Sequence, residues 1–287
     1  MTSSKQSIAT CKLAHHWHSA PHKSSLIIDA AHETGRHCLW FSETKPMLVC
    51  MEQRLTFPDR QRSLAQYRLR AEGYDSELAA FEPIRHSAIA QLGLNLGDTV
   101  LDAGCGTGLS FEPLQRAVGA GGGIIGVEQS ADMLSKAQDR ISELGWVNVT
   151  LLNTPAELAS TPTLADAALF HFTHDILRNP AAISHMMHCL KPGARVVAAG
   201  LQWANPWAFA TNWCVMLAAM YSTTSLEGLD KPWSYLADYL GKFEVSTTSM
   251  QGVYIASGVL MMPFDLARAT ASASLMPSTP ADKMPPA

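Results

Sequence analysis

The residues best suited to chemistry lie in a glycine-rich segment, Asp102-Ala-Gly-Cys-Gly-Thr-Gly108, which follows the apolar residues Val100 and Leu101. A glycine turn between a strand and a helix lets a ligand approach the backbone, and the helix start offers free N–H groups. The dinucleotide-binding fingerprint G-x-G-x-x-G does not fit, because its third glycine would fall at Leu109 or Phe111. A phosphate-binding loop does not fit either, since no Gly-Lys-Ser or Gly-Lys-Thr follows. The pattern that remains is D-x-G-x-G-x-G after an apolar strand.

This pattern resembles the cofactor-binding loop of the class I S-adenosylmethionine-dependent methyltransferases, in particular their small-molecule, methyltransferase type 11-like branch. The segment from Gly122 to Leu134 resembles the second strand and helix of that family, and Leu190-Lys-Pro-Gly193 resembles its turn into the fifth strand. The three motifs occur in the family's order, within a resemblance that spans about Tyr67 to Val259. The resemblance implies S-adenosylmethionine as cofactor and S-adenosylhomocysteine as product.

The resemblance also implies which residues hold the cofactor. Glu128 ends the second apolar run, where an acidic residue can accept hydrogen bonds from both ribose hydroxyls. The alternative is a carboxylate at a helix start, before an N-capping Ser130. Asp102 is expected to orient the glycine loop and to face the ammonium group of the ligand, with a turn-forming aspartate as the alternative. The full expected cofactor-binding set is Tyr67, Asp102, Gly104, Cys105, Gly106, Gly108, Glu128, Gln129, Met133, Asn153, Ala156 and His171.

One position departs from the family's pattern. After the third strand, the family usually has an acidic residue that binds the adenine amino group, followed by a residue that donates its backbone N–H. Pro155 stands at the acidic position, and proline has neither a carboxylate nor an N–H. We expect Ala156 to donate its N–H to the ring, and Asn153 or Glu157 to bind the amino group.

The expected reaction centre lies at the end of the fourth strand, in Leu169-Phe-His-Phe-Thr-His-Asp175, because ligands of a doubly wound sheet bind beyond the carboxyl ends of its strands. His174 is the candidate catalytic residue, a general base, since an unperturbed imidazole titrates at about pH 6.5 and can take a proton. His171 is expected to line the cofactor pocket. For both histidines, packing or solvent exposure is the alternative. Asp175 is expected to orient His174 or to cap the following helix.

This segment also narrows the choice of acceptor. It lacks the Asp/Asn-Pro-Pro-aromatic motif of amino-group DNA and some protein methyltransferases, and the chain lacks the Pro-Cys nucleophile of cytosine-C5 enzymes. Nucleic acid is therefore not an expected partner. The helix that follows carries His185 and His188, which we expect at the surface.

Aromatic residues are dense in residues 201–241, between the fifth strand and the C-terminal strands. They are Trp203, Trp207, Trp213, Tyr221, Trp233, Tyr235 and Tyr239. The family commonly inserts a substrate-binding cap here, and aromatic side chains favour an apolar or planar small molecule. We expect Trp203, Trp207 and Trp233 to bind the substrate, although packing of the cap on the sheet is the alternative for any one ring. A flat heteroaromatic compound, a phenol or quinone precursor, and a lipid amine all remain open.

The elements that must position these residues alternate along the chain. Short apolar strands are predicted at 99–101, 124–128, 147–152, 167–172 and 195–199. Amphipathic helices are predicted at 83–92, 109–118, 131–144 and 180–190. This alternation indicates a parallel sheet covered on both faces, and residues 243–249 with 253–259 predict an antiparallel hairpin at its edge. The predicted fold is therefore α/β: a doubly wound, Rossmann-like, mostly parallel sheet with a helical cap after strand five.

The composition excludes several classes of protein. The 287 residues carry a formal net charge of −4, which argues against a strongly basic nucleic-acid-binding protein. The six cysteines have no CxxC spacing, so neither a metal site nor a disulfide framework is predicted, and a reduced, cytoplasmic protein is expected. The longest apolar run, Trp213 to Tyr221, is far shorter than the ~20 residues that span a bilayer, and no signal peptide is recognisable.

The chain is expected to divide into three parts of unequal length. Residues 1–50 are histidine-rich and keep no helical or strand period, so we expect a disordered or non-native leader, with a metal-binding tail as the alternative. The domain is expected at 51–268 and a disordered tail at 269–287. The sequence thus predicts methyl transfer to a small apolar or aromatic acceptor by in-line displacement. The alternatives are methylation of a lipid amine or a macromolecule, and a non-catalytic S-adenosylmethionine-binding protein. The oligomeric state stays open.

Overall fold

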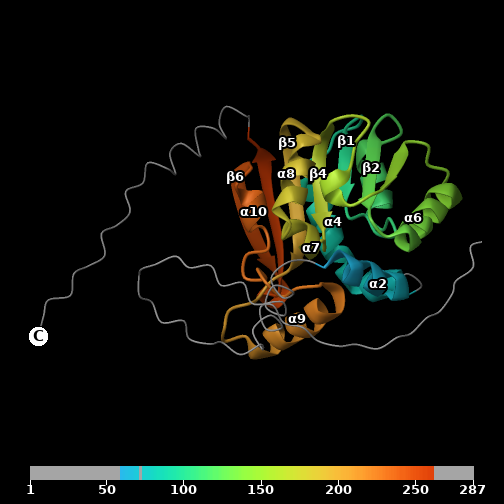
Figure 1. Cartoon of the computed structure of the whole chain (residues 1–287). Coiled ribbons are helices and arrows are strands. Elements are labelled where there is room, and N and C mark those ends of the chain that lie inside the picture. Colours follow the sequence, from blue (N-terminus) through green and yellow to red (C-terminus); the bar gives the residue numbers. More distant parts are fainter. Residues whose placement is uncertain (1–58, 71–72, 262–287) are drawn as a thin grey trace, which may run out of the picture. The chain divides into compact units, whose positions relative to one another are not determined.

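A seven-stranded sheet forms the centre of the computed structural model, which describes residues 59–70 and 73–261 (Figure 1). The strand order is β3-β2-β1-β4-β5-β7-β6, and the first five strands in this order run parallel. Strand β7 pairs antiparallel with both β5 and β6, so the C-terminal hairpin forms the predicted edge. The strands are β1 (Thr99–Ala103), β2 (Gly123–Glu128), β3 (Val149–Asn153), β4 (Ala165–His171), β5 (Leu190–Leu201), β6 (Leu240–Thr248) and β7 (Val253–Leu260).

Helices cover both faces of the sheet, as the predicted doubly wound fold requires. In Figure 1, α8 lies in front of the strands and α4 behind them, while α2, α7 and α9 lie below the sheet. The helices are α2 (Arg60–Arg70), α3 (Tyr74–Leu78), α4 (Glu82–Gln91), α5 (Phe111–Val118), α6 (Ala131–Leu144), α7 (His174–Leu177), α8 (Pro180–His188), α9 (Phe209–Ser222) and α10 (Ser234–Ala237). The fold class is therefore the predicted one, although α2 and α3 were not foreseen.

Two hydrophobic cores result from the alternation of side chains along the strands. Val100 of β1 packs with α4, α5 and α6 on one face of the sheet. Its neighbour Leu101 packs with α8 and α10 on the other face. Both residues are fully buried, which explains why the strand is apolar throughout rather than alternating.

The helix starts on the carboxyl side of the strands are fixed by local capping. Helix α6 begins after Ser130, whose hydroxyl accepts a hydrogen bond from Met133 N, and it ends before Gly145 in the left-handed conformation. Helix α8 begins after Asn179, whose side chain accepts from the backbone of Ala181, and Pro180 occupies its first turn. These caps hold the chain where it leaves β2 and the segment after β4.

The segment between β5 and β6 carries α9 and α10, so the predicted insertion is helical. We keep the name cap for residues 201–241. The backbone of Trp203 donates to Leu229 O, which ties the start of the cap to the segment between α9 and α10. Within residues 59–70 and 73–261, no helix is long and apolar enough to cross a membrane. The expectations for residues 1–50 and 269–287 fall outside the described residues.

Candidate functional site

A cavity of about 950 Å³, counting the part open to solvent, lies at the carboxyl ends of β1, β2 and β4. Several parts of the chain line it: helix α2, Tyr74 of α3, the glycine loop after β1, the turns after β2 and β3, and the residues that follow β4. Figure 1 shows α2 and α7 below these strand ends. Doubly wound sheets bind their ligands at this edge.

The glycine loop requires glycine for two different reasons. At Gly104, φ is +75° and a Cβ atom would lie 2.5 Å from Thr173 Cγ2, so a side chain would collide with the segment after β4. At Gly108, φ is +78° and a Cβ atom would lie 2.6 Å from the ring of Phe111. Gly104 and Gly106 line the cavity, whereas Gly108 allows the loop to pack on α5.

Cys105 does not line this cavity, although the sequence placed it in the cofactor-binding set. Its side chain is buried, and a Cβ atom on Gly126 of β2 would lie 2.9 Å from its sulfur. Burial raises the pKa of the Cys105 thiol well above its usual value, and the nearby Asp102 adds to this rise. Cys105 therefore packs between the loop and β2, and it lines a small neighbouring cavity together with Asp102.

Glu128 ties the glycine loop to the start of α6. Its Oε2 accepts a hydrogen bond from Gly106 N at 3.2 Å, and its Oε1 accepts from Ser130 N at 2.7 Å. Burial raises the pKa of Glu128, and the bonds from the backbone of Ser130 and Gly106 oppose that rise. The carboxylate lines the cavity with its remaining lone pairs free for a ligand.

The turn after β3 contributes Thr154, Ala156 and Glu157 to the cavity, but not Asn153. Asn153 is exposed, and its Nδ2 donates to Glu128 O at 3.0 Å, so it supports the neighbouring strand instead of a ligand. Gln129 and Met133 line the cavity from the side of α6, as the sequence predicted. Of the two candidates for the adenine amino group, only Glu157 is in position.

A second, small cavity adjoins the first and is lined by Arg85, Asp102 and His171. Each of these buried side chains has an atom without a hydrogen-bond partner among the described residues: Arg85 Nη2, Asp102 Oδ2 and His171 Nε2. Burial raises the pKa of Asp102 to about 7, although Arg85 acts against the rise. Burial, helped by Arg85, lowers the pKa of His171 well below its usual value, so the imidazole is neutral. Buried polar groups normally have partners, so this cluster has unused hydrogen-bonding capacity for a polar group of a ligand.

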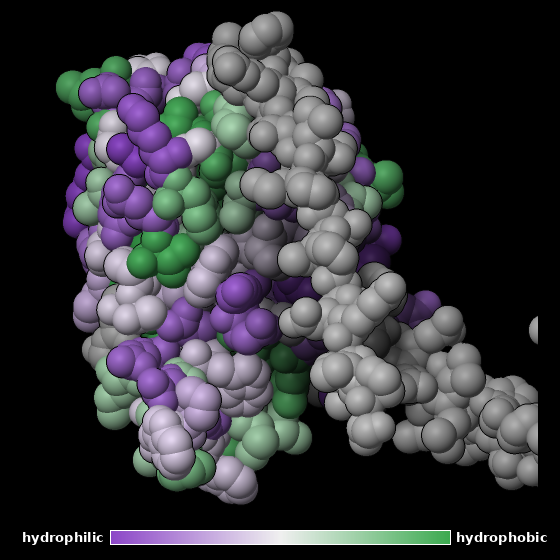
Figure 2. Space-filling view, turned by 90° about the vertical axis from the view of Figure 1, so that its left-hand side faces the viewer, coloured by the Kyte–Doolittle hydropathy of each residue, from purple (hydrophilic) through white to green (hydrophobic). Residues whose placement is uncertain are grey.

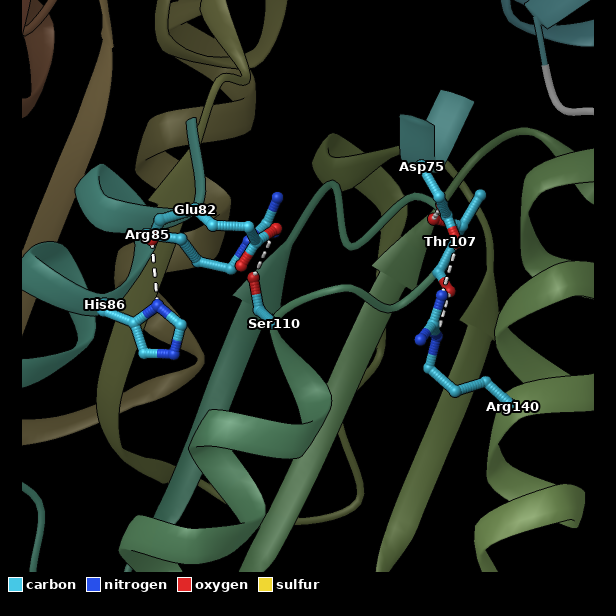
Figure 3. A network of polar contacts seen from close by, with 7 residues as sticks. All are labelled: Asp75, Glu82, Arg85, His86, Thr107, Ser110 and Arg140. Atoms are coloured by element: carbon cyan, nitrogen blue, oxygen red, sulfur yellow. Dashed lines mark hydrogen bonds and ion pairs between the residues drawn. The ribbon is translucent and has the colours of Figure 1, made fainter. Parts of the chain in front are cut away.

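Two polar networks hold the glycine loop from either side (Figure 3). On one side, Arg85 donates from Nη1 to Ser110 Oγ and from Nε to Glu82 Oε1, both at 3.1 Å. On the other, Asp75 accepts from Thr107 Oγ1 at 2.6 Å and from Arg140 Nη2 at 2.5 Å. Residues 75 to 85, which precede the sheet, thereby fix the position of the loop that follows β1.

The segment after β4 is strained at the point where it enters the cavity. Phe172 has φ of +57°, which is unfavourable for a residue with a bulky side chain. Its N–H donates to Ala199 O at 2.7 Å, and its ring lies 4.8 Å from that of Phe81. Next to it, Thr173 Oγ1 is buried without a partner among the described residues. Strain of this kind is typical of functional sites.

His174 lines the cavity, but its pKa is not the unperturbed imidazole value that the sequence analysis assumed. Its Nε2 lies 3.0 Å from Glu227 O, and because a carbonyl only accepts, Nε2 carries the proton. Its Nδ1 is buried without a partner among the described residues. Burial lowers the pKa of His174 to about 4, so the imidazole is neutral at physiological pH with Nδ1 as an acceptor.

Asp175 does not orient His174, contrary to one expectation, nor does it supply a cap hydrogen bond to α7. It accepts hydrogen bonds from the backbone N–H of Thr224 at 3.2 Å and from the hydroxyl of Thr224 at 2.9 Å. It therefore attaches the cap to the reaction centre.

The comparisons with known proteins agree with this geometry. The sequence profile of a family described as "Methyltransferase domain" matches residues 100–193. The 2-phytyl-1,4-naphtoquinone methyltransferase of Trichormus variabilis is 26% identical over 176 residues, which are 58% of this chain and 75% of the relative. The demethylmenaquinone methyltransferase of Tropheryma whipplei is 33% identical over 117 residues, 39% of this chain and 46% of the relative. The matched profile contains the glycine loop, Glu128 and the segment after β4. Residues 100–193 therefore form a methyltransferase domain, and the findings together support a class I S-adenosylmethionine-dependent methyltransferase.

A solved structure supports the fold of this methyltransferase. The geranyl diphosphate C-methyltransferase of Streptomyces coelicolor superimposes with a TM-score of 0.50 at 18% identity, over 63% of this chain and 76% of the other. At this identity, the likeness concerns the arrangement of strands and helices only. The acceptor must be inferred from the methyltransferase's own cavity.

Helix α2 brings residues to the cavity that the sequence analysis of the methyltransferase mostly missed. Arg60 and Ser63 join the predicted Tyr67 in lining it. The Tyr67 hydroxyl donates to Ser222 O at 3.1 Å, and Gln129 Nε2 donates to Ser63 Oγ at 3.4 Å. Ser63 is the one buried residue among those whose burial is described in α2, so no apolar period marked this helix in advance.

The three tryptophans expected to bind the substrate of the methyltransferase do not line the cavity. Trp233 packs on Tyr254 with ring centroids 4.7 Å apart, so it belongs to the core. Trp203 is half-buried at the start of the cap, and Trp207 is 82% exposed. The aromatic density of the cap predicted a binding role, but the rings in question serve packing or face outward.

One further histidine differs from its prediction. His185 is half-buried rather than on the surface, because its Nε2 lies 2.6 Å from Ala159 O and ties α8 to the turn after β3. His188 is exposed, as expected.

Proposed function

We propose that this methyltransferase binds S-adenosylmethionine in the cavity and transfers its methyl group to a small apolar or aromatic acceptor. The observation that carries the proposal is the pairing of the two adjoining cavities. One offers a carboxylate and apolar walls, and the other offers three buried polar atoms without partners among the described residues. S-adenosylmethionine is a nucleoside joined to an amino acid, so its nucleoside part matches the first cavity and its charged amino-acid part matches the second.

The large cavity suits the nucleoside part of the cofactor. A carboxylate has about four lone-pair sites, and the backbone N–H groups of Gly106 and Ser130 each use one on Glu128, so this side chain can also accept from ribose hydroxyls. Met133, Val127 and Ala156 supply apolar walls for a planar ring. Glu157 lines the same part of the cavity and replaces the acidic residue that Pro155 displaces.

The small cavity suits the amino-acid part of the cofactor. Among the described residues, Arg85 Nη2 and Asp102 Oδ2 have no hydrogen-bond partner, so the first suits a carboxylate and the second an ammonium group. Neutral His171 offers an acceptor or a donor at Nε2, depending on its tautomer. Burying these polar atoms without partners costs free energy, which favours the binding of a zwitterion whose charged groups pair with them.

The bound cofactor would supply a methyl group on a sulfonium, whose thioether is already a good leaving group. The protein then has to hold the acceptor in line and exclude water. Phe172 is locked by its backbone bond to Ala199, and Thr173 and His174 offer an unpartnered hydroxyl and an unprotonated Nδ1 beside it. We propose that these two groups orient a hydroxyl, amine or acidic C–H of the acceptor.

The acceptor class is proposed from two kinds of evidence. The relatives in Trichormus and Tropheryma act, by their names, on a phytyl-naphthoquinone and on demethylmenaquinone. The walls of the cavity near His174 include Tyr67, Phe172 and Ile176, which suit a flat apolar ring. A quinone-like or phenolic compound therefore fits better than a charged amine or a nucleic acid.

Two further expectations from the sequence are kept as proposals. The working domain is proposed at residues 51–268, because every residue that lines the cavity lies between Arg60 and Asn179 and the sheet ends at Leu260. The cytoplasm is proposed as the compartment.

Binding of S-adenosylmethionine is expected to strengthen as the pH rises toward 7. Burial raises the pKa of Asp102 to about 7, and only the ionised carboxylate attracts the ammonium group of the ligand. Below that pKa, linkage predicts up to about tenfold weaker binding per pH unit. Calorimetric titrations between about pH 5.5 and pH 7.5, below the α-amino pKa of about 7.7–8.0, would measure this. An Asp102→Asn variant should bind S-adenosylmethionine weakly, and its affinity should not change across this pH range. A wild-type affinity that does not change with pH would contradict the assignment of Asp102 to the ammonium group.

The turnover number is expected to stay level from neutral pH down to about pH 5, because burial lowers the pKa of His174 to about 4 and the neutral imidazole is the working form. A His174→Phe variant removes the acceptor at Nδ1 and should lower kcat by about ten- to hundredfold, the effect of losing one buried hydrogen bond. The measurement is a pH profile of kcat at saturating cofactor. An inflection near pH 6.5 that vanishes in His174→Phe would instead support a general base with an ordinary pKa.

The proposed function itself is tested by calorimetry of the full chain with S-adenosylmethionine and S-adenosylhomocysteine. Both are expected to bind. Next, a panel of quinones, phenols and planar heteroaromatic compounds is incubated with the protein and the cofactor, and the products are examined for the mass of one added methyl group. Failure to bind either nucleoside would overturn the cofactor assignment. Turnover only with amines or macromolecules would overturn the acceptor class.

A further inference from the structure

Helix α9 of the cap does not have the side-chain pattern expected of a helix that only covers a core. It buries small residues, Thr211, Val215 and Ala219. Its large apolar side chains point outward and recur at helical spacing along one side. They are Phe209 (74% exposed), Trp213 (61%), Leu217 (51%), Met220 (58%) and Tyr221 (52%), which we call the apolar stripe. A surface helix normally buries its large apolar residues.

The apolar stripe is part of a wider uncharged surface. No charged residue occurs between Val196 and Leu226. A shallow groove beside the start of α9 is lined by Trp207 and Met250, which are 82% and 75% exposed. In Figure 2, pale and green side chains gather at the lower end of the view, at the height where Figure 1 places α9. Contiguous exposed apolar surface of this kind marks a binding surface.

The stripe is bordered by a basic helix. Helix α2 has the sequence RQRSLAQYRLR, without an acidic residue, and Arg60, Arg62 and Arg68 are exposed. It touches the end of α9, because Gln66 Nε2 donates to Tyr221 O and the Tyr67 hydroxyl donates to Ser222 O. Among the described residues, two acidic side chains lie close to this surface: Glu77 accepts from the Tyr221 hydroxyl at 2.8 Å, and Asp132 Oδ2 lies 4.0 Å from Arg68 Nε.

We propose that the apolar stripe and α2 together bind the surface of a lipid bilayer that carries anionic headgroups. Tryptophan, phenylalanine and leucine side chains at the interface would enter the boundary between headgroups and acyl chains, and the arginines would meet the lipid phosphates. A second copy of this chain could also cover the apolar stripe. The neighbouring arginines favour the anionic bilayer, because they give the surface a charge that such a bilayer complements.

The helix lies on the bilayer and does not span it. At about 1.5 Å per residue, a 14-residue helix such as α9 is some 21 Å long, short of the ~30 Å hydrocarbon core. Helix α2 also lines the cofactor cavity, so the bound face is next to the site. An apolar acceptor dissolved in the bilayer would then reach the cavity without crossing water.

The test is cosedimentation of the full-length protein with vesicles. One set is phosphatidylcholine alone and the other contains about 30% phosphatidylglycerol. We expect clear binding to the anionic vesicles, weaker binding to the neutral ones, and a loss of the difference when the salt is raised to about 0.5 M. No binding of the wild-type protein to the anionic vesicles would overturn the proposal.

Two matched double variants test whether vesicle binding depends on the apolar stripe or on any exposed apolar side chain. Trp213→Ser with Leu217→Ser should lower partitioning onto anionic vesicles about tenfold or more. Leu96→Ser with Val147→Ser removes side chains that are 80% and 96% exposed outside the cap and should leave partitioning unchanged. Both variants should keep the melting temperature and cofactor affinity of the wild type. Equal vesicle binding by both variants would overturn the proposal. So would a dimer that depends on the stripe, seen by analytical ultracentrifugation, together with no vesicle binding.

Discussion

A Glu128→Ala protein is expected to bind S-adenosylmethionine more weakly by about 1–3 kcal/mol, or roughly five- to 150-fold in Kd. The carboxylate holds Gly106 N and Ser130 N on the protein side, so its loss leaves two backbone donors of the site without their acceptor. It also removes the proposed acceptor for the ribose hydroxyls. Isothermal titration with S-adenosylhomocysteine measures the effect without turnover.

The matched control is Glu143→Ala, which removes an exposed carboxylate from the last turns of α6 and should leave the affinity unchanged. A Glu128→Gln protein should fall between the two, because one oxygen can still accept a hydrogen bond while the amide nitrogen would face a second donor. If Glu128→Ala bound the ligand as well as the wild type, the carboxylate would be structural only and the ribose assignment would fail.

A Gly104→Ala protein should lose about 2–4 kcal/mol of stability and most of its cofactor binding. Part of the loss comes from a φ of +75°, which costs a residue with a Cβ atom about 1–2 kcal/mol. The larger part comes from contact, since the new methyl group would lie 2.5 Å from Thr173 Cγ2 and 3.0 Å from Ile176 Cδ1. Thermal unfolding and calorimetry report the two consequences separately.

Two comparisons divide this effect into its causes. Gly97 has φ of +92° and nothing within 4 Å of a built Cβ atom, so Gly97→Ala should show the backbone cost alone and leave binding intact. Adding Thr173→Ser to Gly104→Ala removes the colliding methyl group and should recover part of the lost stability. If the single and double variants unfold at the same temperature, the contact with Thr173 is not the cause.

The fold was predictable because the strands have a recognisable sequence pattern of their own. Val100 and Leu101 face opposite cores, so the strand reads as continuously apolar, which is typical of a parallel sheet covered on both faces. Helix α6 has the predicted bounds because Ser130 and Gly145 mark its two ends. Helix α2 carries no such signal, since its contacts are hydrogen bonds to the cap and to Gln129 and an ion pair to Asp132 of α6 rather than a buried apolar face.

The site was predictable where the residue type itself decides the geometry. The positive φ of Gly104 and Gly106 and the carboxylate of Glu128 at a strand end are encoded locally. The state of His174 is not, because its pKa depends on burial under residues near Glu227, more than fifty positions away in the chain. The role of Trp233 was missed for a related reason, since a ring that packs on Tyr254 and a ring that binds a substrate have the same sequence pattern.

Helix α2 also bears on how fast the enzyme can exchange its ligands. It lines the cavity but buries little of itself. Its described attachments to the rest of the fold include the hydrogen bond of Tyr67 to Ser222, the ring contact of Tyr67 with Tyr74 and the ion pair of Arg68 with Asp132. Displacing it therefore costs a few surface contacts rather than a hydrophobic core. If α2 opens to release the spent cofactor, the sheet can stay undisturbed, and we expect cofactor release to be faster than unfolding of the core.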